Sequence, residues 1–502
     1  MRKLHGVLLA LTTAMSLPAI AASPPSEFKA LATAIERVKN ATGYQTGTAV
    51  AVVKDGKVIY EGYFGYADIG ARRPVDRHTS FYIASTTKPF LALHALLKAR
   101  TGELDTTNTL QAMFPDAGFT GIDARATSIK DLLTHTSGID NQPLVWATAF
   151  SGLHDANSRE RLVAASHANA TAARGTFDYS NVGYNILSVW LDRRFAQPWQ
   201  DQLAATVFAP LGMTRTSAYI SEAKTKGWPL AKPYSAMGTN RDAPLYLEKA
   251  DATMHAAGGL ISTAPDLARF VIAELGDGML DGTRVFPEGV IAQSHAVQAA
   301  TDDQYLDFKR SGYAWGWYAG AYKGKRMLHH FGAFAGFHAH LSFIPEANVG
   351  LVVLNNEDFL SARLTSLIAD QVYGTLLHEP GIEAKSAARV DELLEKAMAL
   401  PQMAAKQREA IEGRAWLLSR PRQAYAGTYT HPLLGDITVA LDAAGAMVIR
   451  WGRLAAVATA YERADQVRVE FVPNAGDVLA FEVHDDRVDA LAFEGMTFKK
   501  IP

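Results

Sequence analysis

A serine and a lysine three residues apart, Ser85 and Lys88, are the first residues whose types and spacing indicate covalent chemistry. They stand at the start of an apolar run with helical spacing, and Pro89 fits only within the first turn of such a helix. A separation of three places both side chains on one face. A serine hydroxyl becomes a nucleophile when a nearby base takes its proton, and a desolvated lysine can be that base. The pattern is short, so an ordinary solvated helix face fits it too.

A tyrosine and an asparagine two residues apart, Tyr179 and Asn181, precede a helix predicted over residues 186–195. In an extended loop, residues two apart point the same way. A tyrosine beside a lysine can be held as a phenolate or can share its proton, and either form could act as a general base. A buried tyrosine followed by a helix-capping asparagine is the alternative interpretation.

Further along, His330, Phe331 and Gly332 lie in a strand and loop that glycines punctuate. His135 follows a short capped helix predicted within residues 128–138, and we expect it to make structural hydrogen bonds there rather than to act as a base. The stretch 255–270 combines a glycine turn, a short strand and a capped helix. We expect this stretch to be scaffold.

The elements around these residues predict one shared sheet. Asp55-Gly56 between two apolar runs is a strong hairpin signal for residues 48–60, after a helix predicted over 28–42. Strands are expected again late in the chain, before a closing helix, with a mainly helical stretch between the two strand groups. We therefore expect the N- and C-terminal strands to share one antiparallel sheet. The late elements are an aromatic strand over 313–318, two strands at 341–344 and 350–354, and a helix over 362–377.

After residue 385 the sequence pattern changes, first to a helical stretch and then to short β-prone runs. Residues 385–418 predict a helical connector that is split near Pro401, because proline breaks a helix. About eight short β-prone runs with turn residues between them follow from Ala426, as in a small antiparallel barrel or sandwich. The predicted organisation is a signal peptide over 1–21, a catalytic domain over 22–380, a linker over 381–423 and an all-β domain over 424–502.

Composition narrows the class of protein. The 502 residues are 48% hydrophobic and 20% charged, as in a soluble globular protein, and the net charge of −2 gives no reason to expect nucleic acid as a partner. The absence of cysteine excludes disulfides and thiolate metal sites. Arg2 and Lys3, an apolar run and Ala19-Ile20-Ala21 form a secretory signal, so we expect a periplasmic or secreted protein. No later segment is apolar for long enough to span a bilayer, and the oligomeric state is not predicted.

The three motifs, in this order, resemble those of the serine β-lactamase and penicillin-binding-protein superfamily, in its class C-like branch of esterases, D-stereospecific peptidases and lactamases. The resemblance covers about residues 28–376. It implies an α+β fold, in which helices flank an antiparallel sheet beside a helical lobe, with no metal and no cofactor. The C-terminal part resembles the small lipocalin-like domain of some of these peptidases.

The resemblance also implies residue roles. Ser85 would be the acylated nucleophile, while Lys88 and Tyr179 would share the base and acid roles. Asn181 would hold Lys88 and the substrate amide. The backbone N–H groups of Ser85 and Ala333, the residue after Gly332 on an edge strand, would form the oxyanion hole.

The third motif departs from that of lactamases and carboxypeptidases. His330 replaces a lysine and Phe331 replaces a hydroxyl, so we expect weak recognition of a free carboxylate there. His330-Phe331-Gly332 resembles D-aminopeptidases, related D-peptidases and some esterases. We therefore expect an exported peptidase acting on small, D-residue-containing or cell-wall-derived peptides. The alternatives are an esterase or acyl-transfer enzyme, a β-lactamase or D,D-carboxypeptidase, and a binding protein without turnover. Four aromatic residues near the motif could line an apolar subsite or belong to the core: Trp315, Trp317, Phe334 and Phe337.

Overall fold

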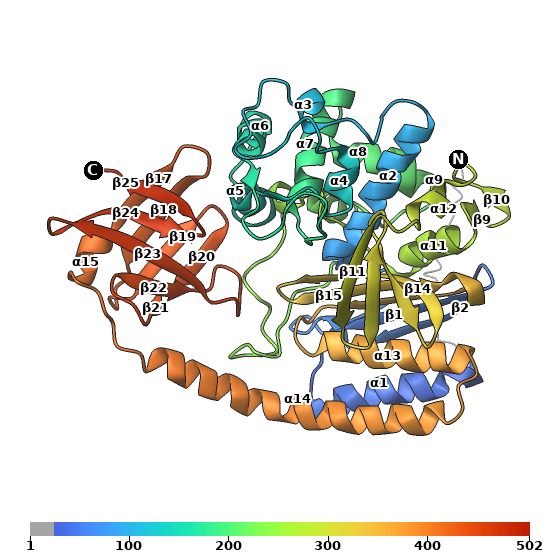
Figure 1. Cartoon of the computed structure of the whole chain (residues 1–502). Helices are drawn as coiled ribbons and strands as arrows, with labels where there is room; N and C mark the ends of the chain where they lie inside the picture. The colour runs from blue at the N-terminus through green and yellow to red at the C-terminus, as the bar shows by residue number, and fades with distance from the viewer. Residues whose placement is uncertain (1–24) are drawn as a thin grey trace, which may run out of the picture.

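An eight-stranded antiparallel sheet forms the centre of the protein (Figure 1). The computed structural model describes residues 25–502, so the predicted signal peptide over 1–21 lies outside the described residues. From one edge to the other, the strands are β11 (Ala299–Tyr305), β12 (Phe308–Tyr313), β13 (Tyr318–Tyr322), β14 (Lys325–Phe334), β15 (Phe337–Ile344), β16 (Val349–Asn355), β1 (Thr48–Lys54) and β2 (Lys57–Phe64). Because β1 pairs with β16, the expectation that the N-terminal hairpin and the late strands share one antiparallel sheet is confirmed.

Both faces of the sheet are buried, as the alternation along β1 shows. Val50 and Val52 pack with α1 (Lys29–Thr42) and α13 (Ser361–Leu376), whereas Ala49, Ala51 and Val53 belong to the core that holds α2 (Lys88–Arg100) and α11 (Ala264–Leu275). Successive strand residues point to opposite faces, so a continuous apolar run marks a strand that is covered on both sides. The predicted α+β class with helices on both faces is confirmed.

A helical lobe lies on the α2 side of the sheet. The predicted capped helix is α4, whose Ser128 side chain accepts a hydrogen bond from Asp131 N. The helix predicted from residue 186 begins four residues earlier, at Val182. The helices of the lobe are α3 (Leu110–Met113), α4 (Ile129–Leu133), α5 (Gln142–Trp146), α6 (Ala156–Ala164), α7 (Val182–Phe195), α8 (Trp199–Leu203), α9 (Ala209–Leu211) and α10 (Ile220–Thr225).

The single aromatic strand predicted over residues 313–318 is wrong. β12 ends at Tyr313 and β13 begins at Tyr318, and the chain reverses between them. Gly316 makes this turn with φ +82°, and a Cβ there would lie 2.6 Å from Pro89 Cα at the start of α2. The aromatic residues are β-prone, but the glycine decides the local path.

The long helix α14 (Ile382–Glu412) runs continuously through Pro401, so the predicted split is wrong. Val390, Leu393, Ala397 and Leu400 are buried in the core that also contains residues of α1 and α13. This packing holds the helix together across a residue that lacks an N–H donor.

After the short helix α15 (Arg422–Tyr425), nine strands form a nearly closed barrel-shaped sheet (Figure 1). Consecutive strands β20 and β21 are separated only by Ala458, yet they lie at opposite ends of the strand order. The strands are β17 (Gly427–His431), β18 (Gly435–Leu441), β19 (Met447–Trp451), β20 (Leu454–Val457), β21 (Thr459–Ala460), β22 (Gln466–Val469), β23 (Asp477–His484), β24 (Arg487–Phe493) and β25 (Met496–Lys500).

The barrel contacts the helical lobe near α5. The Trp146 ring stacks on Trp451 with centroids 5.7 Å apart and meets Phe493 edge-on at 4.7 Å. Arg453 N also donates to Ser151 O at 3.0 Å. Among residues 25–502, no helix is both long and apolar enough to cross a membrane, and no group of three or more acidic or histidine side chains is placed to hold a metal ion.

Candidate active site

Ser85 lies in a 3-10 turn (Ala84–Thr87) that leads into α2. The α-helix itself begins at Lys88, with Pro89 in its first turn as predicted. Ala84 has φ +45°, which is uncommon for a residue with a side chain. Pairing of β5 (Phe81–Tyr82) with β8 (Ile261–Ser262), and a bond from Ile83 N to Leu260 O at 3.0 Å, hold this path. The stretch predicted to be scaffold therefore supports the turn that presents Ser85.

Lys88 is fully buried and makes three close polar contacts. Its Nζ lies 3.1 Å from Ser85 Oγ, 2.8 Å from Asn181 Oδ1 and 2.9 Å from the Ala257 carbonyl oxygen. Burial lowers the pKa of Lys88 well below its usual value. An uncharged amine has two N–H bonds, and the two oxygens that only accept, on Asn181 and Ala257, take both of them. The nitrogen lone pair is then left for the Ser85 hydroxyl.

Tyr179 lies beside this pair, with its ring centroid 4.7 Å from Lys88 Nζ. Burial is the largest cause that raises the pKa of Tyr179 well above its usual value, and a hydrogen bond with Ser85 opposes it. The residue is nevertheless 36% exposed, so solvent reaches part of it. A raised pKa keeps the proton on Tyr179, which disfavours the phenolate alternative.

Asn181 stands at the N-cap position of α7, but its side chain makes no capping bond. The side chain turns instead toward Lys88. The interpretation of Asn181 as a helix cap is therefore wrong, and Ser85, Lys88, Tyr179 and Asn181 meet in one place as the motif interpretation required.

His330 is buried and uncharged at neutral pH, because burial, and to a lesser degree the nearby Lys88, lower its pKa well below the usual value. Its Nδ1 lies 2.8 Å from the Phe331 carbonyl oxygen and must carry the proton, since that oxygen only accepts. Its Nε2 lies 3.4 Å from the Tyr313 hydroxyl. Phe331 packs on the opposite face of the sheet, against Phe308. Neither side chain supplies a charge to the site.

Gly332 and Ala333 run directly past the nucleophile turn. A Cβ on Gly332 would lie 2.0 Å from Ile83 O and 3.0 Å from Ser85 N, so only glycine allows this approach. The expectation that this strand is an edge strand is wrong, because β14 lies between β13 and β15. The pairing with β13 ends at His329, however, and the exposed Ala333 lies beyond it.

Two histidines border the site without being among the residues predicted to act in it. His135 Nδ1 accepts a hydrogen bond from Ser180 N at 3.2 Å, and its ring lies 4.5 Å from that of Tyr179, which fits the structural role expected for it. His255 Nδ1 lies 3.2 Å from Asn185 Oδ1. Burial lowers the pKa of His255 well below its usual value, and Lys249 and Lys88 contribute less. Nothing in the sequence marked His255 or Lys249, because neither belongs to a motif.

Of the four aromatic residues near the third motif, the two tryptophans are core. Trp317 is fully buried and stacks with Phe270 of α11 at 6.0 Å, and Trp315 is 4% exposed. Phe334 is half-buried and meets Tyr82 edge-on at 5.4 Å. Phe337 is also buried against Tyr82.

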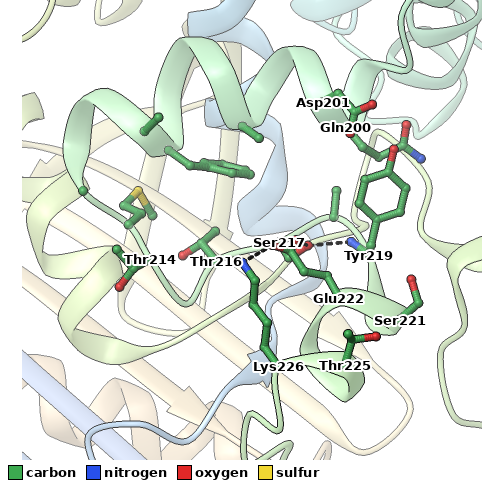
Figure 2. Close-up of a pocket in the computed structure, with 16 residues that line it drawn as sticks. Gln200, Asp201, Thr214, Thr216, Ser217, Tyr219, Ser221, Glu222, Thr225 and Lys226 are labelled. Carbon is green, nitrogen blue, oxygen red and sulfur yellow. Dashed lines mark hydrogen bonds and ion pairs between the residues drawn. The ribbon is translucent and has the colours of Figure 1, made fainter.

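A separate, open cavity of about 920 Å³ lies in the helical lobe (Figure 2). Glu222 accepts hydrogen bonds there from Lys226 Nζ at 2.6 Å and from Ser217 Oγ. All of the residues that line it lie between positions 200 and 226, and none of them is among the residues around Ser85. The size of this cavity is therefore no guide to the chemistry.

Comparison with known proteins gives one family and many similar proteins, three of which are described below. The family described as Beta-lactamase matches residues 32–372. Unguisins hydrolase ungD of Aspergillus violaceofuscus is 26% identical over 433 residues, which are 79% of this chain and 74% of that protein. The octameric penicillin-binding protein homologue from Pyrococcus abyssi is similar in structure, with a TM-score of 0.58 and 21% identity over 93% of this chain and 98% of that one. EstCE1, a hydrolase with promiscuous acyltransferase activity, has a TM-score of 0.56 and 22% identity over 69% of this chain and 99% of that one.

Proposed function

Because the chain belongs to the beta-lactamase family, we propose that it is an exported serine hydrolase that forms an acyl-enzyme on Ser85. The observation that carries the proposal is the environment of Lys88. Its buried amine lies 3.1 Å from Ser85 Oγ, and two acceptor oxygens take its N–H bonds. A neutral amine in this position is a base for the serine hydroxyl.

In acylation, Ser85 Oγ attacks the substrate carbonyl carbon while its proton passes to Lys88 Nζ. The leaving nitrogen or oxygen needs a proton as its bond to carbon breaks. Tyr179 is protonated and close to Ser85, so it donates this proton and regains one from the Lys88 ammonium. In deacylation, water gives a proton to the same pair as its oxygen attacks the ester carbon. The bond from that carbon to Ser85 Oγ then breaks, and the pair returns the proton to Ser85. Asn181 holds Lys88 in place and faces the substrate amide.

The oxyanion would accept hydrogen bonds from the backbone N–H groups of Ser85 and Ala333. Along an antiparallel strand, successive residues bond to opposite sides. Phe334 and Phe337 close the hairpin as partners, so Ala333, one position earlier, directs its N–H away from β15 and toward the Ser85 turn. Each such donor typically contributes about 10²–10³ in rate.

We infer that the substrates are small or D-residue-containing peptides, among them cell-wall-derived peptides. Related lactamases and carboxypeptidases use a lysine and a hydroxyl at the third motif to bind a carboxylate. Here His330 is uncharged and Phe331 faces the other side of the sheet. This supports a peptidase over a β-lactamase or D,D-carboxypeptidase.

An esterase or acyl-transfer enzyme is the alternative, and one observation favours it. The ring of Tyr179, a residue that is 36% exposed, stacks on Tyr318 with centroids 5.9 Å apart, and the Tyr179 hydroxyl hydrogen-bonds with Ser85. An aromatic wall of this kind suits an apolar acyl chain as well as a peptide side chain.

The remaining proposals concern organisation. We propose cleavage of a signal peptide over 1–21, which would place the enzyme in the periplasm or outside the cell. Residues 22–380 would form the catalytic domain and residues 424–502 the barrel domain, with 381–423 as linker. The contact of Trp146 with the barrel supports a role of the barrel in shaping the lobe beside the site.

The first experiment is a parallel rate assay of the mature protein, with Ser85→Ala as the blank. Its substrates are p-nitrophenyl esters of two chain lengths, D- and L-alanine p-nitroanilides, and nitrocefin. Hydrolysis of the D-anilide with little turnover of nitrocefin is the expected result. Ester hydrolysis alone would favour the esterase, and rapid nitrocefin turnover would overturn the interpretation of the third motif. No turnover, together with no Ser85-dependent label from a fluorophosphonate, would leave a binding protein.

A further inference from the structure

Lys249 is, besides Lys88, the other buried lysine among residues 25–502. It lies in an irregular segment after the helical lobe, and its Nζ donates to the Ala149 carbonyl oxygen at 2.7 Å. Three aromatic rings surround the same nitrogen. Their centroids lie 3.7 Å (Phe334), 5.0 Å (Tyr82) and 5.6 Å (Phe150) from it.

No carboxylate within the described part of the chain pairs with Lys249. The neighbouring Glu248 turns away and pairs with Lys232 at 2.5 Å. An ammonium has three N–H bonds, and the Ala149 oxygen takes one. Aromatic faces stabilise a cation by roughly 0.5–2 kcal/mol, whereas removing an ammonium from water costs several. Accordingly, burial holds the pKa of Lys249 well below its usual value in the free protein.

The position of Lys249 links it to the proposed chemistry. Phe334, which lies beneath its Nζ, directly follows Ala333, and Tyr82 precedes Ser85 by three residues. Burial lowers the pKa of His255, and either lysine, Lys249 or Lys88, lowers it further when it is protonated, so both amines lie near this histidine. Lys249 therefore lies at the junction of the lobe segment 149–150, the end of β14 and the strand that leads to the nucleophile.

A cavity of about 90 Å³ adjoins this junction and is lined by Lys249, Tyr82, Phe337 and Ser80 among others. The Ser80 hydroxyl is buried and has no hydrogen-bond partner. A buried hydroxyl without a partner is costly, so an unfilled donor beside an unpaired amine points to a ligand with acceptor oxygens.

The other basic groups near the site do not offer a free charge. His330 is uncharged at neutral pH, and oxygen atoms of Ser85, Asn181 and Ala257 already surround the Lys88 amine. Arg310 pairs with Asp303 at 3.0 Å, and its guanidinium lies 3.6 Å from the centroid of the Tyr318 ring. Among the buried basic side chains beside the site, Lys249 is thus the one that a substrate carboxylate could engage without displacing an ion-pair partner.

From these contacts we propose that Lys249 and Ser80 form a subsite for a carboxylate on the substrate. The inference rests on the proposed hydrolase function and narrows its substrates to acidic ones. Entry of the carboxylate protonates Lys249, so binding takes up a proton from solvent when the amine is neutral beforehand.

The test compares matched substrates that differ only in a carboxylate. For the acyl side, these are N-succinyl- and N-butyryl-alanine p-nitroanilide; for the leaving-group side, alanyl-alanine and its C-terminal amide. The alanine has the configuration that the enzyme cleaves. We expect kcat/KM to favour the carboxylate in one of the two pairs, and Lys249→Met to lower that preference by about 10- to 100-fold. The pair that responds identifies the side on which the carboxylate lies.

Lys232→Met is the matched control, since Lys232 lines the same cavity but already pairs with Glu248. It should leave the preference unchanged. No preference in either pair, or a preference that Lys249→Met does not alter, would overturn the proposal. If neither compound of either pair is cleaved and p-nitrophenyl esters are not hydrolysed, the proposed hydrolase function itself has failed, which is a different outcome.

A second measurement does not depend on the folding of the Lys249 variant. Calorimetric titration of Ser85→Ala, which retains Lys249, with the succinyl and butyryl compounds and with the two dipeptides compares affinities directly. Tighter binding of a carboxylate-bearing member, with proton uptake that changes with the ionisation enthalpy of the buffer, supports the subsite. Equal affinities within both pairs would overturn it.

Discussion

The two buried lysines occupy opposite kinds of environment, although burial depresses the pKa of both. Lys88 has oxygen atoms on three sides, from Ser85, Asn181 and Ala257. Lys249 has one carbonyl oxygen and three aromatic rings. The first environment satisfies a neutral amine completely and aims its lone pair at a hydroxyl. The second leaves N–H bonds unfilled.

This difference teaches that burial alone does not define the role of a lysine. The geometry of the acceptors decides whether the group works as a base, which must be uncharged, or as a cation, which must be charged. The predictions below test whether Lys88 needs to lose its proton and Lys249 needs to gain one.

The largest effect is expected for Lys88→Met. Removing the base leaves the Ser85 hydroxyl with no group to take its proton, so the rate of acylation should fall by about 10³–10⁴. Burst kinetics with the best p-nitrophenyl ester measures acylation, and circular dichroism checks the fold. A variant that acylates at nearly the normal rate would contradict the role of Lys88, and the contrast between the two lysines would disappear.

Tyr179→Phe should have the next largest effect, a fall in kcat of about 10²–10³, because the leaving group loses its proton donor. The loss should be greater for anilides than for p-nitrophenyl esters, since nitrophenolate leaves without a proton. Rates on both substrate types, measured side by side, test this. An equal loss on both would mean that Tyr179 acts on Ser85 rather than on the leaving group.

The pH dependence that each lysine imposes on the kinetics should have opposite directions. Lys88 must be neutral to act, so kcat/KM for a substrate without a carboxylate should rise with pH through the lowered pKa of Lys88 and then level off. Lys249 must be charged to bind, so the preference for the carboxylate-bearing partner should fall, by about tenfold, as pH rises through the pKa of Lys249. Rates for a matched pair between pH 5 and 10 give both curves. Parallel curves for the two substrates would show that Lys249 does not respond to the carboxylate.

The sequence could predict the fold and the motif residues because each has a local signature. Asp55-Gly56 specifies the β1–β2 hairpin, and the continuous apolar run of β1 marks a strand buried on both faces. Pro89 fixed the helix start to within a few residues. Such patterns depend only on residues that are close in the sequence, so they can be recognised without knowing the tertiary contacts.

What the sequence could not predict depends on long-range packing. The continuity of α14 through Pro401 comes from residues buried against α1 and α13, which local propensity does not see. The capping alternative for Asn181 arose from its position before a helix. Its side-chain oxygen instead contacts Lys88, which is 93 residues away in the sequence. Lys249 carried no signal at all, since its aromatic cage comes from three separate segments.

The smallest expected effect is on the free energy of unfolding, for which the same substitution, lysine to methionine, is compared at positions 88 and 249. A buried amine with a depressed pKa costs folding free energy below its unfolded pKa, because the unfolded chain binds more protons there. Methionine removes this cost, and at position 249 its sulfur can contact the same rings. We therefore expect Lys249→Met to raise the free energy of unfolding by about 1 kcal/mol at pH 7, with the gain shrinking toward pH 10. Lys88→Met should behave alike but gain less, because it leaves two acceptor oxygens without their donor. Urea denaturation at both pH values measures this. A loss of several kcal/mol in Lys249→Met alone would show that the aromatic cage holds the lobe to the sheet as a structural clamp, and that the amine is not kept there for a ligand.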